Sequence, residues 1–401
     1  MEDTNPPLPP SNDQDRPNVT SVHSLRELID MVSGRNFSAN LPQEDMGLAE
    51  PLPFPFLAIV GQTEMKLALL LAVINPMIGG VALIGPRGTA KTTAVRSLLD
   101  LLPDTEHSLC FYGCLPEDVE TGGIDAVCPE CAKKYARGEP LTRKERVRLV
   151  ELPLNARLED VIGGLDERAA IHSRMLLRRG ILSHADKNIL FIDEVNLLSN
   201  EIINAILDAS ATGIYTVRRG VMTATYRARF ILIGSMNPEE GQLRSQIMDR
   251  FGLRIIVPGL TDPQERQEAY RRVSAYRHNP RGTIAQYASD TAQAHQEIIA
   301  ARNLLPKVTI PDSIVKIALD MISQLKIASL RAEITLFEAA RACAAADNRT
   351  EVSADDLRTV APLALRLRQS AFINQYLDAQ AEEQQRINTI INALLPKQEP
   401  K

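Results

Sequence analysis

The strongest constraint on the fold is an apolar, strand-like run that leads into a glycine-containing loop and then into a helical pattern. The run is VALI at 81–84, and the loop that follows reads GPRGTAKT at 85–92. In such a strand–loop–helix unit, successive backbone N–H groups and the positive end of the helix dipole face an anion. A lysine in the loop reaches the outer phosphates of a nucleotide, and the next hydroxyl can ligate Mg²⁺. The segment therefore predicts a nucleotide-binding site.

The candidate contacts to the nucleotide are consecutive residues: Gly85, Pro86, Arg87, Gly88, Thr89, Ala90, Lys91 and Thr92. We assign Lys91 to the outer phosphates and Thr92 to Mg²⁺. The match to G-x-x-x-x-G-K-[ST] is incomplete, because Ala90 stands where the pattern has its second glycine. Alanine fits there if its backbone is right-handed, whereas its methyl group can crowd the β-phosphate. We expect Ala90→Gly to keep or improve ATP affinity. The alternative interpretation of the whole segment is a strand-to-helix turn that happens to contain a lysine.

Two further apolar runs end in polar residues. KNILFI at 187–192 is followed by Asp193 and Glu194, and ARFILIGS at 228–235 is followed closely by Asn237. At the end of a strand, the first acid can hold Mg²⁺ through water, and the second can polarise the attacking water. Asn237 is a candidate to orient that water. The alternatives are a solvated turn for the acids and an ordinary Asn-Pro turn for the amide.

The alternation of strand-like and helical segments predicts an α/β fold with a parallel sheet covered by helices. GIYTVRRGVMTATYRARF at 213–230 alternates as a hairpin does. The predicted divisions are a flexible arm with a transient helix at 1–53, an α/β domain at 54–260 with a cysteine-rich insertion at 108–148, a helical connector at 261–309, a helical domain at 310–370, and a polar helix and tail at 371–401.

Two patterns describe the expected helical domain. Ile327, Leu330, Ile334 and Phe337 recur at three- and four-residue spacing, which predicts one packed apolar face. Ser353 and Asp356 have the spacing of a capping box at the start of a helix. The domain should therefore pack as a small helical unit.

Charge and composition argue against two classes of protein, those that bind nucleic acids and those that span a membrane. The chain has 45 basic and 50 acidic residues, a net charge of −5, so no global basic field attracts a nucleic acid. No apolar run reaches the roughly 18 residues of a membrane span. The acidic, proline-rich start has no secretory pattern, and we expect a cytoplasmic protein.

Four cysteines have the spacing C-x₃-C-x₁₃-C-x₂-C: Cys110, Cys114, Cys128 and Cys131. Two knuckle-like turns of this kind can close a tetrahedral site, and we favour a structural Zn²⁺ there. Four thiolates leave no open position for catalysis. Free or redox-active thiols and a regulatory disulfide are the alternatives.

The order of the phosphate loop, IDEVNLL at 192–198, the hairpin, NPEEGQLRSQIMDRFG at 237–252 and a late helical arginine resembles AAA+ ATPases. It is most similar to the ATPase subunit I family of magnesium chelatase, over about residues 54 to 370. The resemblance implies an AAA+ P-loop nucleotide-binding domain with a smaller all-α lid domain, MgATP as the cofactor, and a homo-oligomeric ring, usually a hexamer. It implies that Arg250 is an arginine finger for a neighbouring subunit and that Arg331 is a sensor that meets its own subunit's γ-phosphate. A structural ion pair is the alternative for each arginine.

The same resemblance implies a function and partners. ATP hydrolysis would drive Mg²⁺ insertion into protoporphyrin IX toward chlorophyll or bacteriochlorophyll. The implied partners are a second AAA-like subunit with an integrin-type domain and a large porphyrin-binding chelatase subunit. A cobalt chelatase, a MoxR-like remodelling ATPase, a nucleic-acid-dependent AAA+ motor and a nucleotide-gated scaffold are the alternatives.

Overall fold

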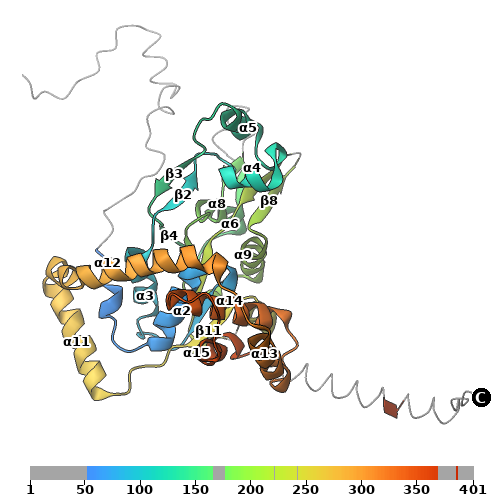
Figure 1. Cartoon of the computed structure of the whole chain (residues 1–401). Coiled ribbons are helices and arrows are strands. Elements are labelled where there is room, and N and C mark those ends of the chain that lie inside the picture. Colours follow the sequence, from blue (N-terminus) through green and yellow to red (C-terminus); the bar gives the residue numbers. More distant parts are fainter. Residues whose placement is uncertain (1–51, 166–176, 221, 242, 369–384, 387–401) are drawn as a thin grey trace, which may run out of the picture. The chain divides into compact units, whose positions relative to one another are not determined.

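The computed structural model describes residues 52–165, 177–220, 222–241, 243–368 and 385–386 (Figure 1). The chain divides into two units, Met1–Pro51 and Leu52–Lys401, and the description below concerns the second. The predicted arm, apart from its last two residues, and most of the predicted C-terminal tail lie outside the described residues. No helix among the described residues is long and apolar enough to cross a membrane.

A five-stranded sheet forms the centre of the unit, and all of its pairings are parallel. The strand order is β11-β1-β10-β7-β4. The strands are β1 (Val81–Ile84), β4 (Leu149–Glu151), β7 (Ile189–Ile192), β10 (Ile231–Met236) and β11 (Leu253–Ile256). Every residue of β1, β7 and β10 is buried, as expected for a parallel sheet with both faces covered. The predicted parallel sheet is confirmed.

Alternate residues of β1 face two separate apolar clusters. Val81 and Leu83 belong to one cluster, and Ala82 and Ile84 belong to the other. The first cluster takes in residues of α2 (Thr63–Ile74), α3 (Lys91–Ser97) and the C-terminal helices. The second includes residues of α6 (Leu158–Ile162), α8 (Ile181–His184) and α9 (Asn200–Thr212). Helices therefore cover both faces of the sheet.

The C-terminal part is helical, as predicted. It consists of α11 (Pro263–His278), α12 (Pro280–Leu304), α13 (Asp312–Gln324), α14 (Leu330–Ala346) and α15 (Ala354–Leu365). The long helix α12 contacts both α2 and α14. The predicted capping box is confirmed: Ser353 accepts from the Asp356 N–H, and the Asp356 carboxylate accepts from the Ser353 N–H.

The predicted apolar face of α14 is wrong at two positions. The exposed fractions of Leu330 and Ile334 are 71% and 56%, whereas Ile327 is buried. The helix instead buries a face that is rich in small residues, with Ala332 and Leu336 at its centre. Alanine lets neighbouring helix backbones approach closely, and α14 packs on α2 and α15 in this way. Tertiary packing thus selects a face that Leu330 and Ile334 do not occupy.

Between α3 and β7 the chain forms the cysteine-rich insertion. Its elements are β2 (Thr105–Ser108), α4 (Pro116–Gly122), α5 (Pro129–Ala136) and β3 (Thr142–Glu145), and β2 pairs with β3. A short antiparallel pair of strands, β5 (Gly163–Leu165) and β6 (Leu177–Arg179), follows. The predicted hairpin at 213–230 is confirmed as β8 (Ile214–Arg219) paired with β9 (Met222–Arg227). Near the end of the α/β part lies a single turn, α10 (Ser245–Met248).

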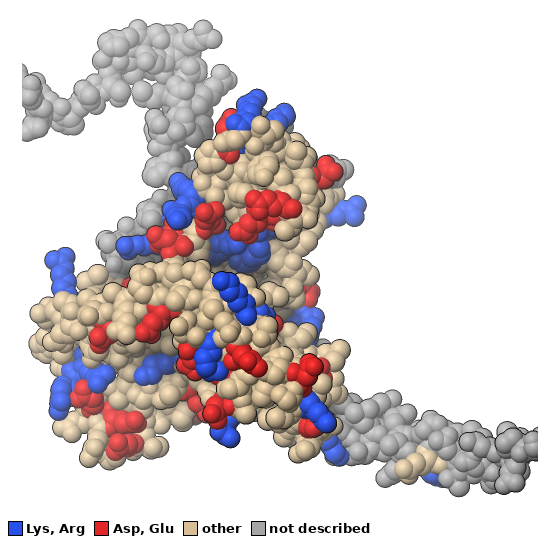
Figure 2. Space-filling view, viewed as in Figure 1, with Lys and Arg blue, Asp and Glu red and all other residues tan. Residues whose placement is uncertain are grey.

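Basic and acidic side chains of the described residues are interspersed on one face of the surface. On the face that Figure 2 shows, they form small mixed groups rather than one basic band. This pattern agrees with the nearly balanced composition.

Candidate nucleotide-binding site

The phosphate loop joins the end of β1 to the start of α3, as the sequence predicts. A Cβ at Gly85 would lie 2.1 Å from the Val257 carbonyl oxygen, so only glycine fits beside β11. Gly88 has a φ of +80° in open space. Its left-handed backbone turns the loop toward the helix, and a side chain there would meet backbone strain but no neighbour.

Ala90 occupies the position just before α3, with φ 67° and ψ 19°. Alanine fits this position without strain only if the backbone is right-handed. The backbone of Ala90 is left-handed instead. A left-handed conformation costs a non-glycine residue roughly 1–2 kcal/mol. The loop therefore holds strain at the position where the motif has glycine.

Lys91 is buried and bends back over the loop. Its Nζ donates to the carbonyl oxygens of Gly85 and Pro86, each at 2.7 Å. Burial lowers the pKa of the Lys91 ammonium, while nearby carboxylates, chiefly Asp193 and Glu194, oppose that shift. A phosphate group would offer the ammonium a charged acceptor in place of two carbonyls.

The predicted magnesium ligands lie together although they are far apart in the sequence. The Thr92 hydroxyl donates to Asp193 Oδ2 at 3.2 Å. A hydroxyl and a carboxylate are the hard oxygen donors that Mg²⁺ prefers. The pair therefore fits the metal of a bound MgATP.

Glu194 and Asn237 follow neighbouring strands and line the same cavity. Arg87 forms an ion pair with Glu194 at 3.2 Å and a second with Glu240. Asn237 is buried, and its Nδ2 donates to Glu240 Oε1 at 3.3 Å. A cavity of about 230 Å³ brings the predicted phosphate, acid and amide residues together. Its lining residues are Arg87, Gly88, Thr89, Ala90, Lys91, Thr92, Thr93, Asp193, Glu194, Ser235 and Asn237.

Sequence reasoning missed Ser235 and Glu240. The Ser235 hydroxyl donates to Asp193 Oδ1 and accepts from the Glu194 N–H at 3.1 Å, so it fixes both acids. Ser235 lies on β10, two residues before Asn237, which directly follows that strand. Strand alternation continued by one residue would place the two on one face. Glu240 lies in the segment NPEEG, which resembles the family, but no local pattern assigns it a role.

A second cavity of about 740 Å³ adjoins the first and shares the loop residues from Arg87 to Ala90 and Thr93. The segment from Ala58 to Val60 lines one side, and α11 contributes Tyr276 and Arg277. This larger, less polar space is suited to the base and ribose of a nucleotide. Sequence reasoning missed it because its walls come from distant segments.

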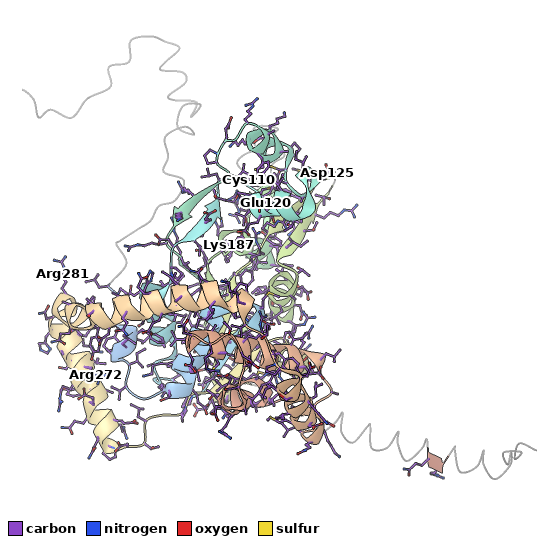
Figure 3. The ribbon with its side chains drawn as sticks, viewed as in Figure 1. Cys110, Glu120, Asp125, Lys187, Arg272 and Arg281 are labelled. Carbon is purple, nitrogen blue, oxygen red and sulfur yellow. The ribbon has the colours of Figure 1, made fainter. Side chains whose placement is uncertain are left out.

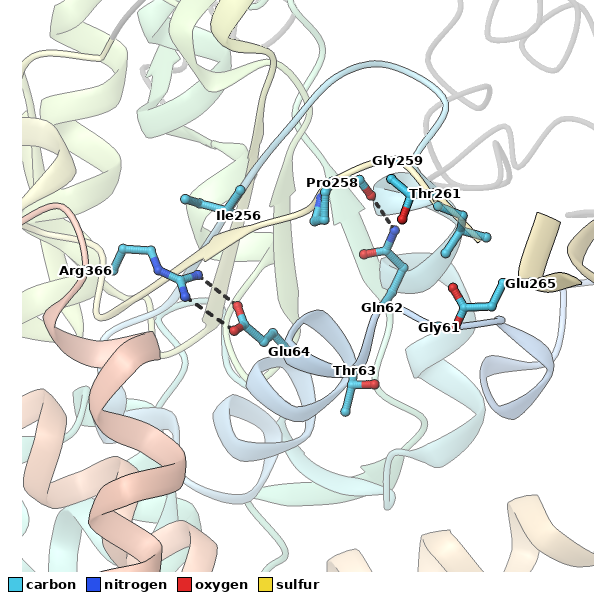
Figure 4. Close-up of a pocket in the computed structure, with 11 residues that line it drawn as sticks. Gly61, Gln62, Thr63, Glu64, Ile256, Pro258, Gly259, Thr261, Glu265 and Arg366 are labelled. Atoms are coloured by element: carbon cyan, nitrogen blue, oxygen red, sulfur yellow. Dashed lines mark hydrogen bonds and ion pairs between the residues drawn. The ribbon is translucent and has the colours of Figure 1, made fainter. Parts of the chain in front are cut away.

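A third cavity, of about 550 Å³, lies beside the start of α2 (Figure 4). Arg366 pairs with Glu64 on one side at 2.8 and 3.3 Å. On another side, Gln62 Nε2 donates to the Pro258 carbonyl oxygen at 2.7 Å. Gln62 also lines the second cavity, so the two spaces adjoin.

The two predicted catalytic arginines do not line any of these three cavities. Arg250 forms an ion pair with Asp208 on α9. Arg331 Nη1 lies 3.5 Å from Asp249 Oδ2. Asp249 also contacts three other side chains: Arg254, Ser329 and Arg368. In the single chain both arginines thus form ion pairs: Arg250 with Asp208, and Arg331 with Asp249, the residue just before Arg250 in the segment MDRFG.

The four clustered cysteines do come together. Their Sγ atoms lie within 4.8 Å of one another, and all four thiols are free. A hydrogen bond with Cys114 lowers the pKa of Cys110 to about 4, and the same contact raises the pKa of Cys114. The fifth cysteine, Cys343, lies apart on α14. The predicted clustering is confirmed, and zinc itself stays a prediction.

Comparisons with known proteins identify the family of this chain. The family described as "Magnesium chelatase, subunit ChlI" matches residues 164–250, and the AAA lid domain matches residues 319–390. The chain is 43% identical to a magnesium-chelatase subunit ChlI homolog of Methanocaldococcus jannaschii, over 82% of this chain and 90% of that protein. It is 42% identical to the magnesium-chelatase 38 kDa subunit of Acidiphilium rubrum, over 79% and 90% of the two chains.

Two further comparisons concern a cyanobacterial relative and the fold. Magnesium-chelatase subunit ChlI of Synechocystis sp. is 40% identical, over 79% of this chain and 88% of that protein. The solved structure of a putative ATPase from Cytophaga hutchinsonii has a TM-score of 0.51 and 21% identity, over 84% of this chain and 91% of that one, and shows a similar fold. On these relatives, the chain belongs to the AAA+ family of magnesium-chelatase subunit ChlI.

Proposed function

We propose that this chain is the ATP-hydrolysing motor subunit of a magnesium chelatase, which drives Mg²⁺ insertion into protoporphyrin IX toward chlorophyll or bacteriochlorophyll. The observation that carries the proposal is the single cavity in which Lys91, Thr92 and Asp193 meet Glu194 and Asn237. Family membership supports the choice of client, because the similar proteins are named as magnesium-chelatase subunits.

Different residues of the cavity would have different roles in ATP hydrolysis. Lys91 would exchange its two carbonyl acceptors for the outer phosphates, and Thr92 with Asp193 would hold the Mg²⁺ of the nucleotide, which offsets charge on the phosphates. Glu194 would accept a proton from the attacking water. Its pairing with Arg87 is no obstacle, since 71% of the Arg87 side chain is exposed and exposed ion pairs contribute only about 0–1 kcal/mol.

The chain would act within a homo-oligomeric ring, a hexamer by its family resemblance. In that ring Arg250 would reach the nucleotide of a neighbour. Its partner Asp208 has a side chain that is 66% exposed, so the pair can separate at little cost when a phosphate competes for the guanidinium. Arg331 stays a predicted sensor, and its contact with Asp249 would also have to open.

The proposed partners are a second AAA-like subunit with an integrin-type domain and a large porphyrin-binding subunit. A cytoplasmic location stays a prediction. A structural Zn²⁺ at the cysteine cluster is a separate proposal, which rests on the geometry of that cluster and not on the nucleotide site.

Reconstitution tests the proposed function. Purified chain is mixed with the two chelatase partners, protoporphyrin IX and MgATP, and Mg-porphyrin formation is followed by fluorescence. Metal insertion that depends on this chain supports the proposal. Insertion of Co²⁺ instead, stimulation of ATP turnover by DNA, or turnover that responds only to an unrelated protein client would each contradict it in favour of one alternative.

The variant Glu194→Gln isolates the chemical step. It should bind ATP normally but hydrolyse it about 10²–10⁴-fold more slowly, because a neutral amide cannot take the proton of water. Glu239→Gln, on an exposed neighbouring carboxylate, is the matched control and should keep its activity. Equal activity of the two variants would remove Glu194 from the mechanism.

A further inference from the structure

The cysteine-rich insertion has only a small apolar core of its own, with Leu115, just before α4, and Val119 of α4 buried outside its cysteine cluster. Its buried cluster consists of three residues, Cys114, Cys131 and Leu141, with Cys110, Val127 and Cys128 packed against it. A unit this small cannot be held by hydrophobic burial alone and normally needs a disulfide or a metal. Since all four of its thiols are free, something else must join its two knuckle-like turns.

The sulfur atoms already form a cage of the right size. Cys110 Sγ lies 3.7 Å from Cys114 Sγ and 3.5 Å from Cys128 Sγ. Zn–S bonds of about 2.3 Å in a tetrahedron place sulfur atoms roughly 3.8 Å apart. Among the residues that the structure describes, no carboxylate or imidazole belongs to this cluster, so its donor set is sulfur alone.

The backbone around the cluster suits thiolates. The Tyr112 N–H donates to Cys110 Sγ, and the Cys128 N–H donates to Cys114 Sγ, each at 3.3 Å. Gly113 has a φ of +78°, which lets the first turn close between two of the cysteines. Cys128 precedes Pro129 at the start of α5, and Cys131 lies in the first turn of that helix.

We propose that Cys110, Cys114, Cys128 and Cys131 bind one structural Zn²⁺, and that this metal fixes the insertion against the hairpin β8–β9. Four thiolates fill the tetrahedron and leave no open position for substrate, so the metal has no catalytic role. Soft sulfur donors favour Zn²⁺ over the Mg²⁺ that the chain uses with ATP.

The contacts that support the second half of the proposal come from the first knuckle, the turn at 110–114, which begins at Cys110 (labelled in Figure 3). The Arg227 N–H donates to the Tyr112 carbonyl oxygen at 3.2 Å, and Arg229 Nη2 donates to that of Gly113 at 2.9 Å. Arg179 Nη2 donates to the Cys110 carbonyl oxygen at 3.0 Å. Three arginines from outside the insertion, two through their side chains and Arg227 through its backbone N–H, thus bind three carbonyl groups of a turn whose two ends would ligate the metal.

A network of charges extends this attachment. Asp118 of α4 pairs with Arg227 at 3.2 Å, and Arg229 also pairs with Asp186 at 3.1 Å. Asp186 lies just before β7 and Arg229 just before β10, the two strands that end at Asp193 and Asn237. Loss of the metal should therefore loosen β8–β9 while the nucleotide cavity at the opposite strand ends stays intact.

The first measurement is the metal content of the full chain purified under reducing conditions. About one equivalent of zinc is expected, and Cys128→Ser should reduce it at least tenfold. Cys343→Ser is the matched control and should retain the zinc. Less than half an equivalent in folded protein, iron in place of zinc, or a thiol count that reveals a disulfide would overturn the metal site.

If Cys128→Ser does not fold, wild-type chain treated with a chelator replaces it. Reconstitution of that chain with Co²⁺ should give the visible absorption of a tetrahedral tetrathiolate, and its absence would overturn the donor set.

Hydrogen exchange tests the attachment to the hairpin. Removal of zinc should speed amide exchange in β8–β9 at least tenfold, and Arg229→Ala should do the same while the zinc stays bound. Unchanged exchange after the metal has left would overturn the attachment and leave the zinc site standing. Neither measurement uses chelatase activity, so the outcome is independent of the proposed client.

Discussion

Ala90→Gly tests whether the phosphate loop carries the strain that its backbone indicates. A left-handed alanine costs roughly 1–2 kcal/mol, and that cost disappears in the glycine variant. Glycine also gives the unfolded chain more conformational freedom, which lowers the free energy of unfolding by about 0.4–1 kcal/mol. The free energy of unfolding should therefore rise by about 0.5–1 kcal/mol, the difference between these two contributions.

Gly88→Ala is the matched control for the same loop. Gly88 also has a positive φ, and a Cβ there would meet no atom within 4 Å. The substitution thus adds backbone strain without a collision, and it should lower the free energy of unfolding by about the amount that Ala90→Gly raises it. The double variant should lie near wild type if the two effects are independent.

Both stability and affinity can be measured. Because the chain has no tryptophan, urea unfolding is best followed by circular dichroism, with affinity from titration of a fluorescent ADP analogue. Ala90→Gly should bind as well as wild type or up to about fivefold better, since about 1 kcal/mol of strain that is relieved only in the bound loop corresponds to about a factor of five in affinity. A tenfold loss of affinity, or a loss of stability, would refute the reasoning.

Two further predictions concern the ring and the response to acid. Arg250→Ala should bind ATP but hydrolyse it poorly, and mixing it with Lys91→Ala subunits should restore some sites; no recovery of turnover in mixed rings would contradict a role across the interface. Burial raises the pKa of Asp356, but its hydrogen bonds, chiefly with Arg349, outweigh this and hold the pKa below its usual value. The stability from this pair is therefore complete above about pH 4 and is lost as the pH falls through the lower folded value. Acid unfolding of Asp356→Asn should show a weaker pH dependence; an unchanged slope would exclude the pair as a contributor.

Strand prediction from the sequence succeeded where the signal was local. The runs that became β1, β7 and β10 are fully buried and continuously apolar, so they stand out in the sequence. The edge strands β4 and β11 were not predicted, because they are short and carry Glu151 and Arg254 among their apolar residues. Their strand character depends on pairing with the buried strands.

The sequence by itself determined the parts of this protein in which chemistry depends on neighbours along the chain. These are the phosphate loop, the acids that follow β7, the capping box at Ser353 and the spacing of the four cysteines. Each follows from covalent geometry and short-range hydrogen bonding, which act within a few residues.

Only the tertiary structure decided the remaining features, because they depend on contacts between distant segments. The left-handed backbone of Ala90, the partner of Arg331, the buried face of α14 and the larger cavity between α11 and the segment at 58–60 are of this kind. The position of a residue in the sequence limits which neighbours its side chain can reach. Packing of the whole unit then selects among those neighbours.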